Sequence, residues 1–135
     1  MLSTKLKDIC NQYGVFILSS TQLNSAYIDT DTPDQNLLRG SKAIADKIDV
    51  GMLLLPITGS DFNSLGKSYN MSAFDSPNIK ISIYKNRRGR YKGIYLWCKA
   101  NLGTCRIKPM FATTFSYEPI DIKDIHIVFE KESAF

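Results

Sequence analysis

Three basic side chains lie together in the run Lys85-Asn86-Arg87-Arg88-Gly89, directly after an alternating apolar stretch at residues 79–84. The alternation predicts a strand, so the charges would sit at the end of a rigid support. Ammonium and guanidinium groups placed this way can neutralise charge that develops on a phosphate, and in multimeric ATPases they act across a subunit boundary as arginine fingers. The alternative is a basic hairpin tip that keeps a strand edge soluble.

A second set of polar side chains follows the apolar run at residues 15–18, in Ser20-Thr21-Gln22-Leu23-Asn24. In open α/β sheets, ligands bind outside the carboxyl ends of the strands, and this is where Gln22 and Asn24 would lie. Their amides can both donate to and accept from a phosphate or a water molecule. The alternative is a polar strand exit or a helix cap.

A third candidate is the start of a short helix, in Arg39-Gly40-Ser41-Lys42. A cap at or near Ser41 would leave backbone N–H groups free, and such a helix end binds anions. Arg39 and Lys42 add positive charge, so the segment is a candidate contact to the phosphates of a nucleic acid. The alternative is an ordinary capped surface helix.

The elements that would position these groups predict an α/β domain with a mixed sheet. Residues 15–18 and 50–55 are continuous apolar runs, typical of parallel strands buried on both faces. Residues 2–13 have helical periodicity and end at Gly14, whereas residues 57–77 resemble a loop with at most a short helical turn. An antiparallel meander is expected to follow, with strands at residues 79–84, 91–99 and 105–110, and then a tail from residue 116.

Size and charge fit one modest domain that can face a polyanion. The chain has 135 residues, 44% of them hydrophobic, and a net charge of +4. Residues 80–108 contain nine Lys or Arg and no Asp or Glu, which gives weak support for a phosphate-facing region.

Several classes of site and location are disfavoured. Cys10, Cys98 and Cys105 lack metal-ligand spacing, and His126 is the single histidine, so no metal site is expected. No apolar run has the length of a membrane span, no secretory signal is present, and an odd cysteine count fits a reducing compartment, so a cytoplasmic location is expected. No phosphate loop of the G-x-x-x-x-G-K-[ST] type occurs.

Taken in order, the three candidate sites resemble the C-terminal half of the motor domain of DnaB-like replicative DNA helicases, which are RecA-like ATPases. The matching pieces are the strand that ends in Thr21-Gln22-Leu23-Asn24, the segment from Leu38-Arg39-Gly40-Ser41-Lys42 to the apolar run at residues 50–54, and Lys85-Asn86-Arg87-Arg88-Gly89. The resemblance covers residues 2–110. It implies that residues 1–115 are a partial RecA-like domain without the Walker A and Walker B segments, and that residues 116–135 are a C-terminal tail.

The resemblance also implies individual roles. Gln22 would be the sensor of nucleotide state, and Arg39, Gly40 and Lys42 would contact single-stranded DNA. Lys85 and Arg87 would be trans-acting fingers that reach the γ-phosphate bound by a neighbouring subunit. ATP and Mg²⁺ would be bound mainly by an N-terminal half of the motor, in a homo-oligomeric ring, a hexamer, that unwinds duplex DNA.

The hypothesis from the sequence is therefore one part of a phage-type replicative helicase that does not hydrolyse ATP by itself. Two alternatives stay open. One is a catalytically inactive, stand-alone nucleic-acid or protein-interaction domain. The other is a related RecA-like ATPase of recombination or regulation.

Overall fold

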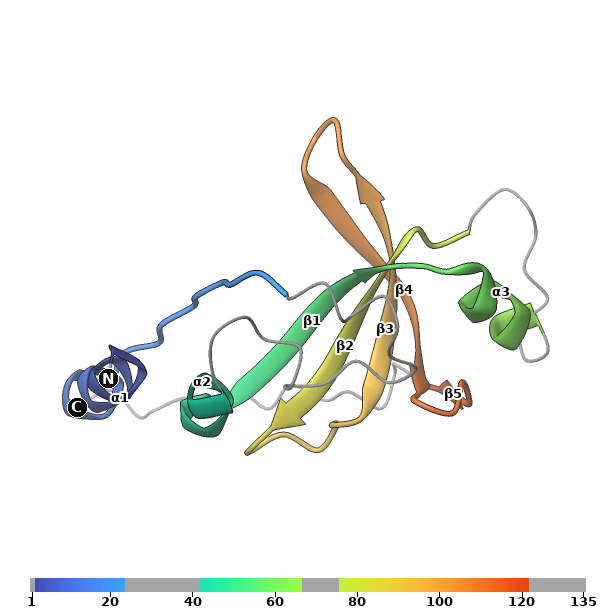
Figure 1. The fold of residues 1–135 in the computed structure, drawn as a ribbon. Coiled ribbons are helices and arrows are strands. Elements are labelled where there is room, and N and C mark those ends of the chain that lie inside the picture. Colours follow the sequence, from blue (N-terminus) through green and yellow to red (C-terminus); the bar gives the residue numbers. More distant parts are fainter. Residues whose placement is uncertain (1, 24–41, 67–75, 122–135) are drawn as a thin grey trace, which may run out of the picture.

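The computed structural model describes residues 2–23, 42–66 and 76–121. Within these ranges the centre of the protein is a five-stranded antiparallel sheet whose strands lie in sequence order, β1-β2-β3-β4-β5 (Figure 1). The strands are β1 (Val50–Pro56), β2 (Ile79–Asn86), β3 (Ile94–Asn101), β4 (Arg106–Thr114) and β5 (Pro119–Ile120). The helices are α1 (Leu2–Tyr13), α2 (Lys42–Lys47) and α3 (Gly59–Gly66).

The predicted mixed sheet, and with it the RecA-like fold, is wrong for the described residues. β1 pairs antiparallel with β2, with Leu53 opposite Ser82 and Leu55 opposite Lys80. Residues 15–18 belong to no strand, and all four side chains are exposed. The physical reason is that a continuous apolar run carries no information about the direction of the neighbouring strand, and it does not ensure burial either, since only alternate side chains of β1 are buried.

The strands expected after residue 78 are present and antiparallel. β2 pairs with β3 from Ile79 to Ile83, β3 pairs with β4 over nearly its whole length, and the short strand β5 extends the sheet beyond β4. Here the alternation at residues 79–84, the run of β-favouring residues at 91–98 and turn residues such as Asn101 and Gly103 carried enough information.

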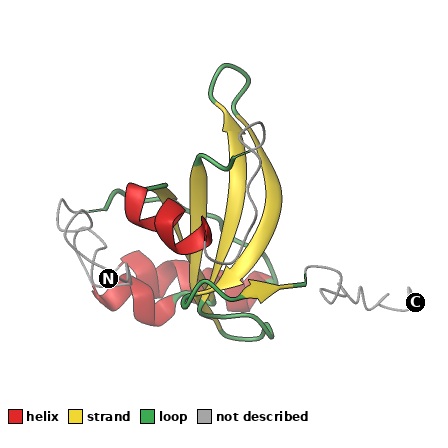
Figure 2. Ribbon diagram, turned by 90° about the vertical axis from the view of Figure 1, so that its right-hand side faces the viewer, coloured by secondary structure: helices red, strands yellow, loops and turns green. Residues whose placement is uncertain are grey.

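The core lies between one face of the sheet and α3. Leu65 of α3 packs on Tyr95 and Trp97 of β3, and four further apolar side chains surround them: Ile57, Phe111, Phe115 and Tyr117. Figure 2 shows α3 lying across this face. The Trp97 indole N–H donates to Thr113 Oγ1 at 2.9 Å, so the polar end of the buried ring is satisfied.

Helix α3 replaces much of the loop that was expected after residue 57. Its start is a capping box, in which the Asp61 carboxylate accepts from the Thr58 backbone N–H at 2.8 Å and the Asp61 N–H donates to Thr58 Oγ1 at 3.3 Å. The pattern Thr58-x-x-Asp61 is visible in the sequence, but the surrounding Gly, Ser and Asn residues favoured a loop.

Helix α1 ends where Gly14 predicts, because Gly14 adopts φ +62°, a left-handed conformation that suits glycine. The chain then runs as an extended, exposed segment toward the sheet (Figure 1). In residues 2–23, 42–66 and 76–121, no helix has both the length and the apolar character needed to cross a membrane.

Candidate functional site at the end of strand β2

The turn after β2 is built around the Asn86 side chain. Asn86 Oδ1 accepts from the Gly89 backbone N–H at 2.9 Å, and Asn86 Nδ2 donates to the Tyr91 carbonyl at 3.1 Å. A Cβ atom at Gly89 would lie 1.9 Å from Asn86 Nδ2, so glycine permits this close approach. The turn thereby sets the direction in which Arg87 leaves the strand.

A β-bulge positions Lys85. Gly51 of β1 is opposite Lys85 and Met52 is opposite Ile83, so Tyr84 is the extra residue of β2. The Tyr84 ring lies directly over Gly51, where a Cβ atom would be 2.3 Å from Tyr84 Cζ. Bulges commonly re-aim side chains at the ends of strands.

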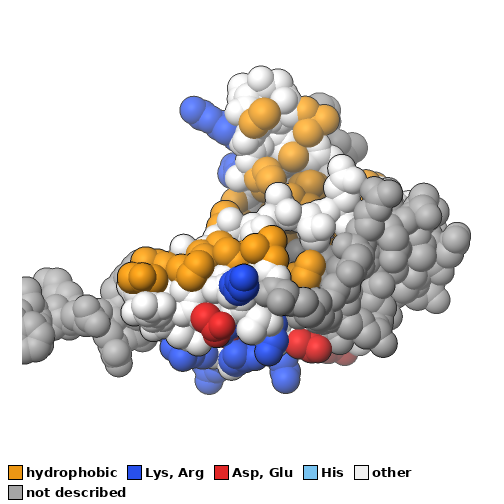
Figure 3. All heavy atoms as spheres, turned by 60° about the vertical axis from the view of Figure 1, so that its left-hand side comes forward, with side chains coloured by type: hydrophobic (Ala, Val, Ile, Leu, Met, Phe, Trp, Pro, Cys, Tyr) orange, Lys and Arg blue, Asp and Glu red, His pale blue; other side chains and the backbone are white. Residues whose placement is uncertain are grey.

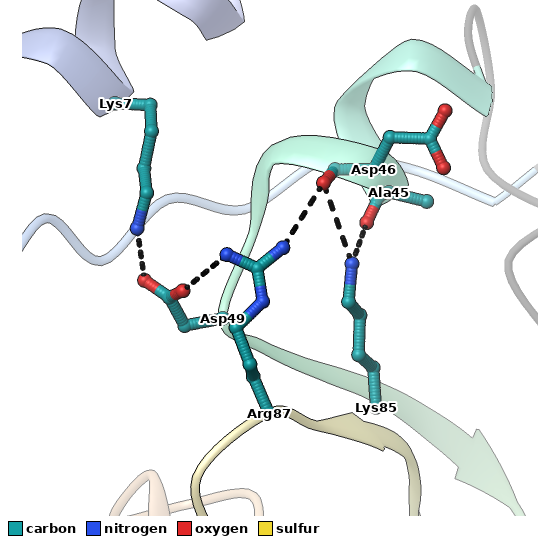
Figure 4. Close-up of polar contacts among 6 residues, drawn as sticks. All are labelled: Lys7, Ala45, Asp46, Asp49, Lys85 and Arg87. Atoms are coloured by element: carbon teal, nitrogen blue, oxygen red, sulfur yellow. Dashed lines mark hydrogen bonds and ion pairs between the residues drawn. The ribbon is translucent and has the colours of Figure 1, made fainter.

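Lys85 and Arg87 both bind the C-terminal end of α2 (Figure 4). Lys85 Nζ donates to the Ala45 carbonyl at 2.6 Å and to the Asp46 carbonyl at 3.5 Å. Arg87 donates through one terminal nitrogen to the Asp46 carbonyl at 3.5 Å. Cations at this end of a helix satisfy its last carbonyls and interact favourably with the helix dipole.

Asp49 joins this cluster to α1. Its carboxylate accepts from Lys7 Nζ at 2.5 Å and from Arg87 at 3.1 Å, and the Arg87 backbone N–H donates to the Asp49 carbonyl. The hydrogen bond from Lys7, with further attraction from Arg87 and Arg88, lowers the pKa of Asp49 below its ordinary value. We call Lys7, Asp49, Lys85 and Arg87, with the α2 carbonyls, the basic cluster.

The structure brings together two of the residues singled out from the sequence, Lys85 and Arg87. Gln22 lies in the exposed extended segment, and none of the contacts drawn in Figure 4 involves it. Arg39 and Gly40 lie outside the described residues. Lys42 is the first residue of α2, and its side chain is not described. Lys42 and the basic cluster are thus at opposite ends of a helix about 9 Å long.

Further positive charge lies beyond the cluster. The side chains of Arg88, Arg90 and Lys92 are exposed in the turn between β2 and β3. Figure 3 shows Lys and Arg side chains gathered on one side of the molecule, next to a band of hydrophobic side chains. This end of the sheet can therefore attract a polyanion.

A buried ion pair beneath α3 was not predicted from the sequence. Lys80 Nζ lies 2.6 Å from Asp61 Oδ1, with Lys80 6% and Asp61 1% exposed. Tyr117 donates to the same oxygen at 2.8 Å, and the Lys80 ammonium lies 4.8 Å from the centre of the Tyr95 ring. The two charged residues are 19 positions apart in the sequence, and no local pattern connects them.

The electrostatics of this pair fit a structural role. Burial acts to raise the pKa of Asp61, but the hydrogen bonds from Lys80, Thr58 and Tyr117 outweigh it, so the pKa is lowered and the carboxylate stays charged. Burial, reinforced by the charge of Asp61, raises the pKa of Tyr95. We call Asp61, Lys80 and Tyr117 the buried brace, because they tie α3 to the sheet and to the segment before β5.

The described residues contain no group of three or more His, Cys, Asp or Glu side chains that could hold a metal ion. Cys10, Cys98 and Cys105 are free thiols, and burial raises the pKa of Cys98.

One curated protein is similar over almost the whole chain. It is the SPbeta prophage-derived uncharacterized protein YorI of Bacillus subtilis (strain 168), 34% identical over 131 residues. The match covers 94% of this chain but only 26% of YorI, so the chain spans about a quarter of the length of its relative. No protein-family profile and no solved structure matches the chain.

Proposed function

We propose that this chain is one part of a DnaB-like phage replicative DNA helicase, in which the basic cluster acts on the γ-phosphate of ATP. ATP and Mg²⁺ would be bound mainly by residues outside this chain, and single-stranded DNA would be contacted by Arg39, Gly40 and Lys42. The prophage origin of the relative supports the phage context. The relative is also much longer than this chain, which leaves room for a nucleotide-binding part.

The single observation that carries the proposal is that Lys85 and Arg87 hold the end of the helix that begins at Lys42. Two of their contacts are long, at 3.5 Å, and Asp49 is exposed to solvent, so the short hydrogen bond from Lys85 to the Ala45 carbonyl is the main contact that a phosphate would have to replace. A phosphate offers more negative charge and a fork that matches a guanidinium. Movement of the two side chains from α2 to a phosphate would release α2 and so pass nucleotide state to the DNA-contacting segment.

The test is an assembly in which this chain replaces the matched region of YorI. Arg87→Ala should lower DNA-stimulated ATP turnover by about a thousandfold or more, with ATP binding nearly unchanged, because a finger stabilises charge that forms in the transition state. Lys85→Ala should lower turnover less. Arg90→Ala is the matched control, since Arg90 is an exposed arginine of the same turn.

Two results would contradict the proposal: no ATP turnover by the wild-type assembly, or equal losses in Arg87→Ala and Arg90→Ala. Mixing Arg87→Ala subunits with subunits that lack the lysine of a phosphate loop should restore some activity, since the two defects then lie on different sides of an interface. A finger that acts within its own subunit would give no such rescue.

A second candidate function is a stand-alone nucleic-acid-binding domain. It is favoured by the self-contained aromatic core and by the exposed Arg88, Arg90 and Lys92. In that case the isolated chain binds single-stranded DNA without nucleotide. Each phosphate contact that is lost reduces the steepness with which the logarithm of the binding constant falls with the logarithm of the salt concentration by roughly 0.7. Arg88→Ala would then weaken binding, whereas in the helicase proposal it has little effect on turnover.

A further inference from the structure

Strand β1 is apolar on both faces, but only one face is covered. Leu53 and Leu55 point into the core and are buried, whereas Met52 is 48% and Leu54 54% exposed. β1 is also the outermost strand, and in the described part of the chain no further strand extends the sheet beyond it. An antiparallel sheet commonly has one face in water, but that face is then polar, whereas here it presents Met52 and Leu54.

A second apolar stretch lies outside the sheet. Residues 15–18 are extended, and Phe16 and Leu18 are almost completely exposed while Val15 and Ile17 are about half exposed. This alternation is that of a β-strand, yet the segment pairs with no described strand. Extended backbone with unpaired N–H and C=O groups is a template for strand addition.

Helix α1 adds a third apolar surface at the same end of the protein. Leu2, Ile9 and Tyr13 are exposed, and no residue of α1 is buried. Figure 3, in which this end of the molecule comes forward, shows a continuous band of hydrophobic side chains. We call Phe16, Leu18, Met52 and Leu54 the apolar edge.

We propose that the apolar edge is a docking surface for a polypeptide that corresponds to the part of YorI outside the matched 131 residues. This partner would place a β-strand beside residues 15–18 and an apolar surface over Met52 and Leu54. The choice of occupant rests on length: nearly the whole chain aligns with YorI, and three quarters of YorI lie beyond the match. Within a single chain of that length, an apolar surface of this kind is expected to be covered by the remaining sequence.

The inference deepens the proposed function, because it locates the surface on which the nucleotide-binding part would dock. It does not depend on ATP or DNA. If docking is demonstrated and Arg87→Ala leaves ATP turnover unchanged, this inference stands and the proposed function is wrong.

The experiment compares amide hydrogen exchange in the isolated chain and in the assembly in which the chain replaces the matched region of YorI, without nucleotide. The amides of residues 16–18 should exchange near the rate of an unstructured chain in isolation. In the assembly they should be slowed by at least about a hundredfold, since they would be paired in a strand. Equal rates in both states would overturn the proposal.

Side-chain variants locate the surface. Phe16→Asp and Leu54→Asp should each remove most of the protection of residues 16–18 in the assembly. Leu102→Asp is the matched control, because Leu102 is 86% exposed in the turn between β3 and β4 and is not part of the apolar edge. Fluorescence of the single tryptophan, Trp97, reports whether each variant keeps its core. Loss of protection by Leu102→Asp equal to that by Phe16→Asp would count against the surface.

Two further measurements test the proposed occupant without relying on the hybrid assembly. In intact YorI, the amides that align with residues 16–18 should exchange slowly. Fast exchange of these amides would overturn the proposal, and this measurement does not need the hybrid assembly to fold. Sedimentation of the isolated chain should show monomers. A dimer that Phe16→Asp dissociates would assign the apolar edge to a second copy of this chain and would overturn the proposed occupant.

Discussion

The two sides of this small sheet are completed in different ways. On the side of α3, the aromatic side chains are buried against one another and the members of the buried brace hydrogen-bond to each other. At the edge formed by β1, α1 and residues 15–18, apolar side chains are exposed, and polar contacts such as Lys7 with Asp49 lie on the surface. One region holds the fold together, and the other has the character of an unfinished interface.

The contrast between the two regions would be wrong if the buried brace did not stabilise the domain. The substitution Asp61→Ala is the strongest test. Removal of the carboxylate leaves the Lys80 ammonium buried without a partner, which should lower the free energy of unfolding by roughly 3–5 kcal/mol. Urea unfolding monitored by Trp97 fluorescence measures this. Asp46→Ala removes an exposed carboxylate and should change stability by less than about 0.5 kcal/mol. Similar losses in the two variants would contradict the role of the brace.

The same carboxylate predicts how the braced side responds to acid. Because the folded state lowers the pKa of Asp61 below its ordinary value of 3.8, the stability it contributes is present above that value and is lost as the pH falls toward the folded pKa. Unfolding free energies measured from roughly pH 5 down to about pH 2 should fall less steeply in Asp61→Asn than in the wild type. Parallel curves would show that other groups control acid unfolding.

Gly51 tests the junction between the two regions. A methyl group there would lie 2.3 Å from Tyr84 Cζ, so Gly51→Ala should cost roughly 1–3 kcal/mol of stability through overpacking. In a Tyr84→Ala background the same substitution should cost much less, and the double-mutant cycle measures that difference. An unchanged cost would mean that the bulge does not depend on this contact.

The smallest effect is expected at the unfinished edge. Lys7→Ala should raise the pKa of Asp49 toward 3.8, as followed by NMR titration, because the hydrogen bond from Lys7 is the largest cause of its lowering. Arg88→Ala should raise it less, since it acts only through charge at a distance. Neither variant should change the thermal midpoint appreciably, because exposed ion pairs contribute little. A large fall in the midpoint would place α1 among the elements that hold the fold.

The sequence predicted best where local patterns decide structure. Gly14 marked the end of α1, alternation marked β2, and a β-favouring run and the turn residues after it marked β3 and β4. The direction of β1 was not predicted, because Leu53 and Leu55 indicate burial and not the orientation of a partner. The buried brace was missed because Asp61 and Lys80 meet only through the tertiary fold.

For the basic cluster, the residue types and their place at a strand end were predictable, whereas their partners were not. Lys85 and Arg87 contact residues about 40 positions earlier in the chain, and those contacts depend on how α2 enters β1. The roles predicted for Gln22, Arg39, Gly40 and Lys42 stay predictions. Arg39 and Gly40 fall outside the described residues, the Lys42 side chain is not described, and the place of Gln22 in an exposed segment does not test a role as a sensor.

The bulge in β2 has a consequence for how this sequence can change over evolutionary time. Between the pair Met52 and Ile83 and the pair Gly51 and Lys85, strand β2 has one residue more than β1, namely Tyr84. Loss of one codon at this point would shorten β2 by one residue, remove the bulge and leave the pairs on both sides of it in register, whereas a deletion elsewhere in a strand without a bulge would shift the register. A single-residue gap at Tyr84 is therefore the length difference that this sheet is expected to accept most readily among related sequences.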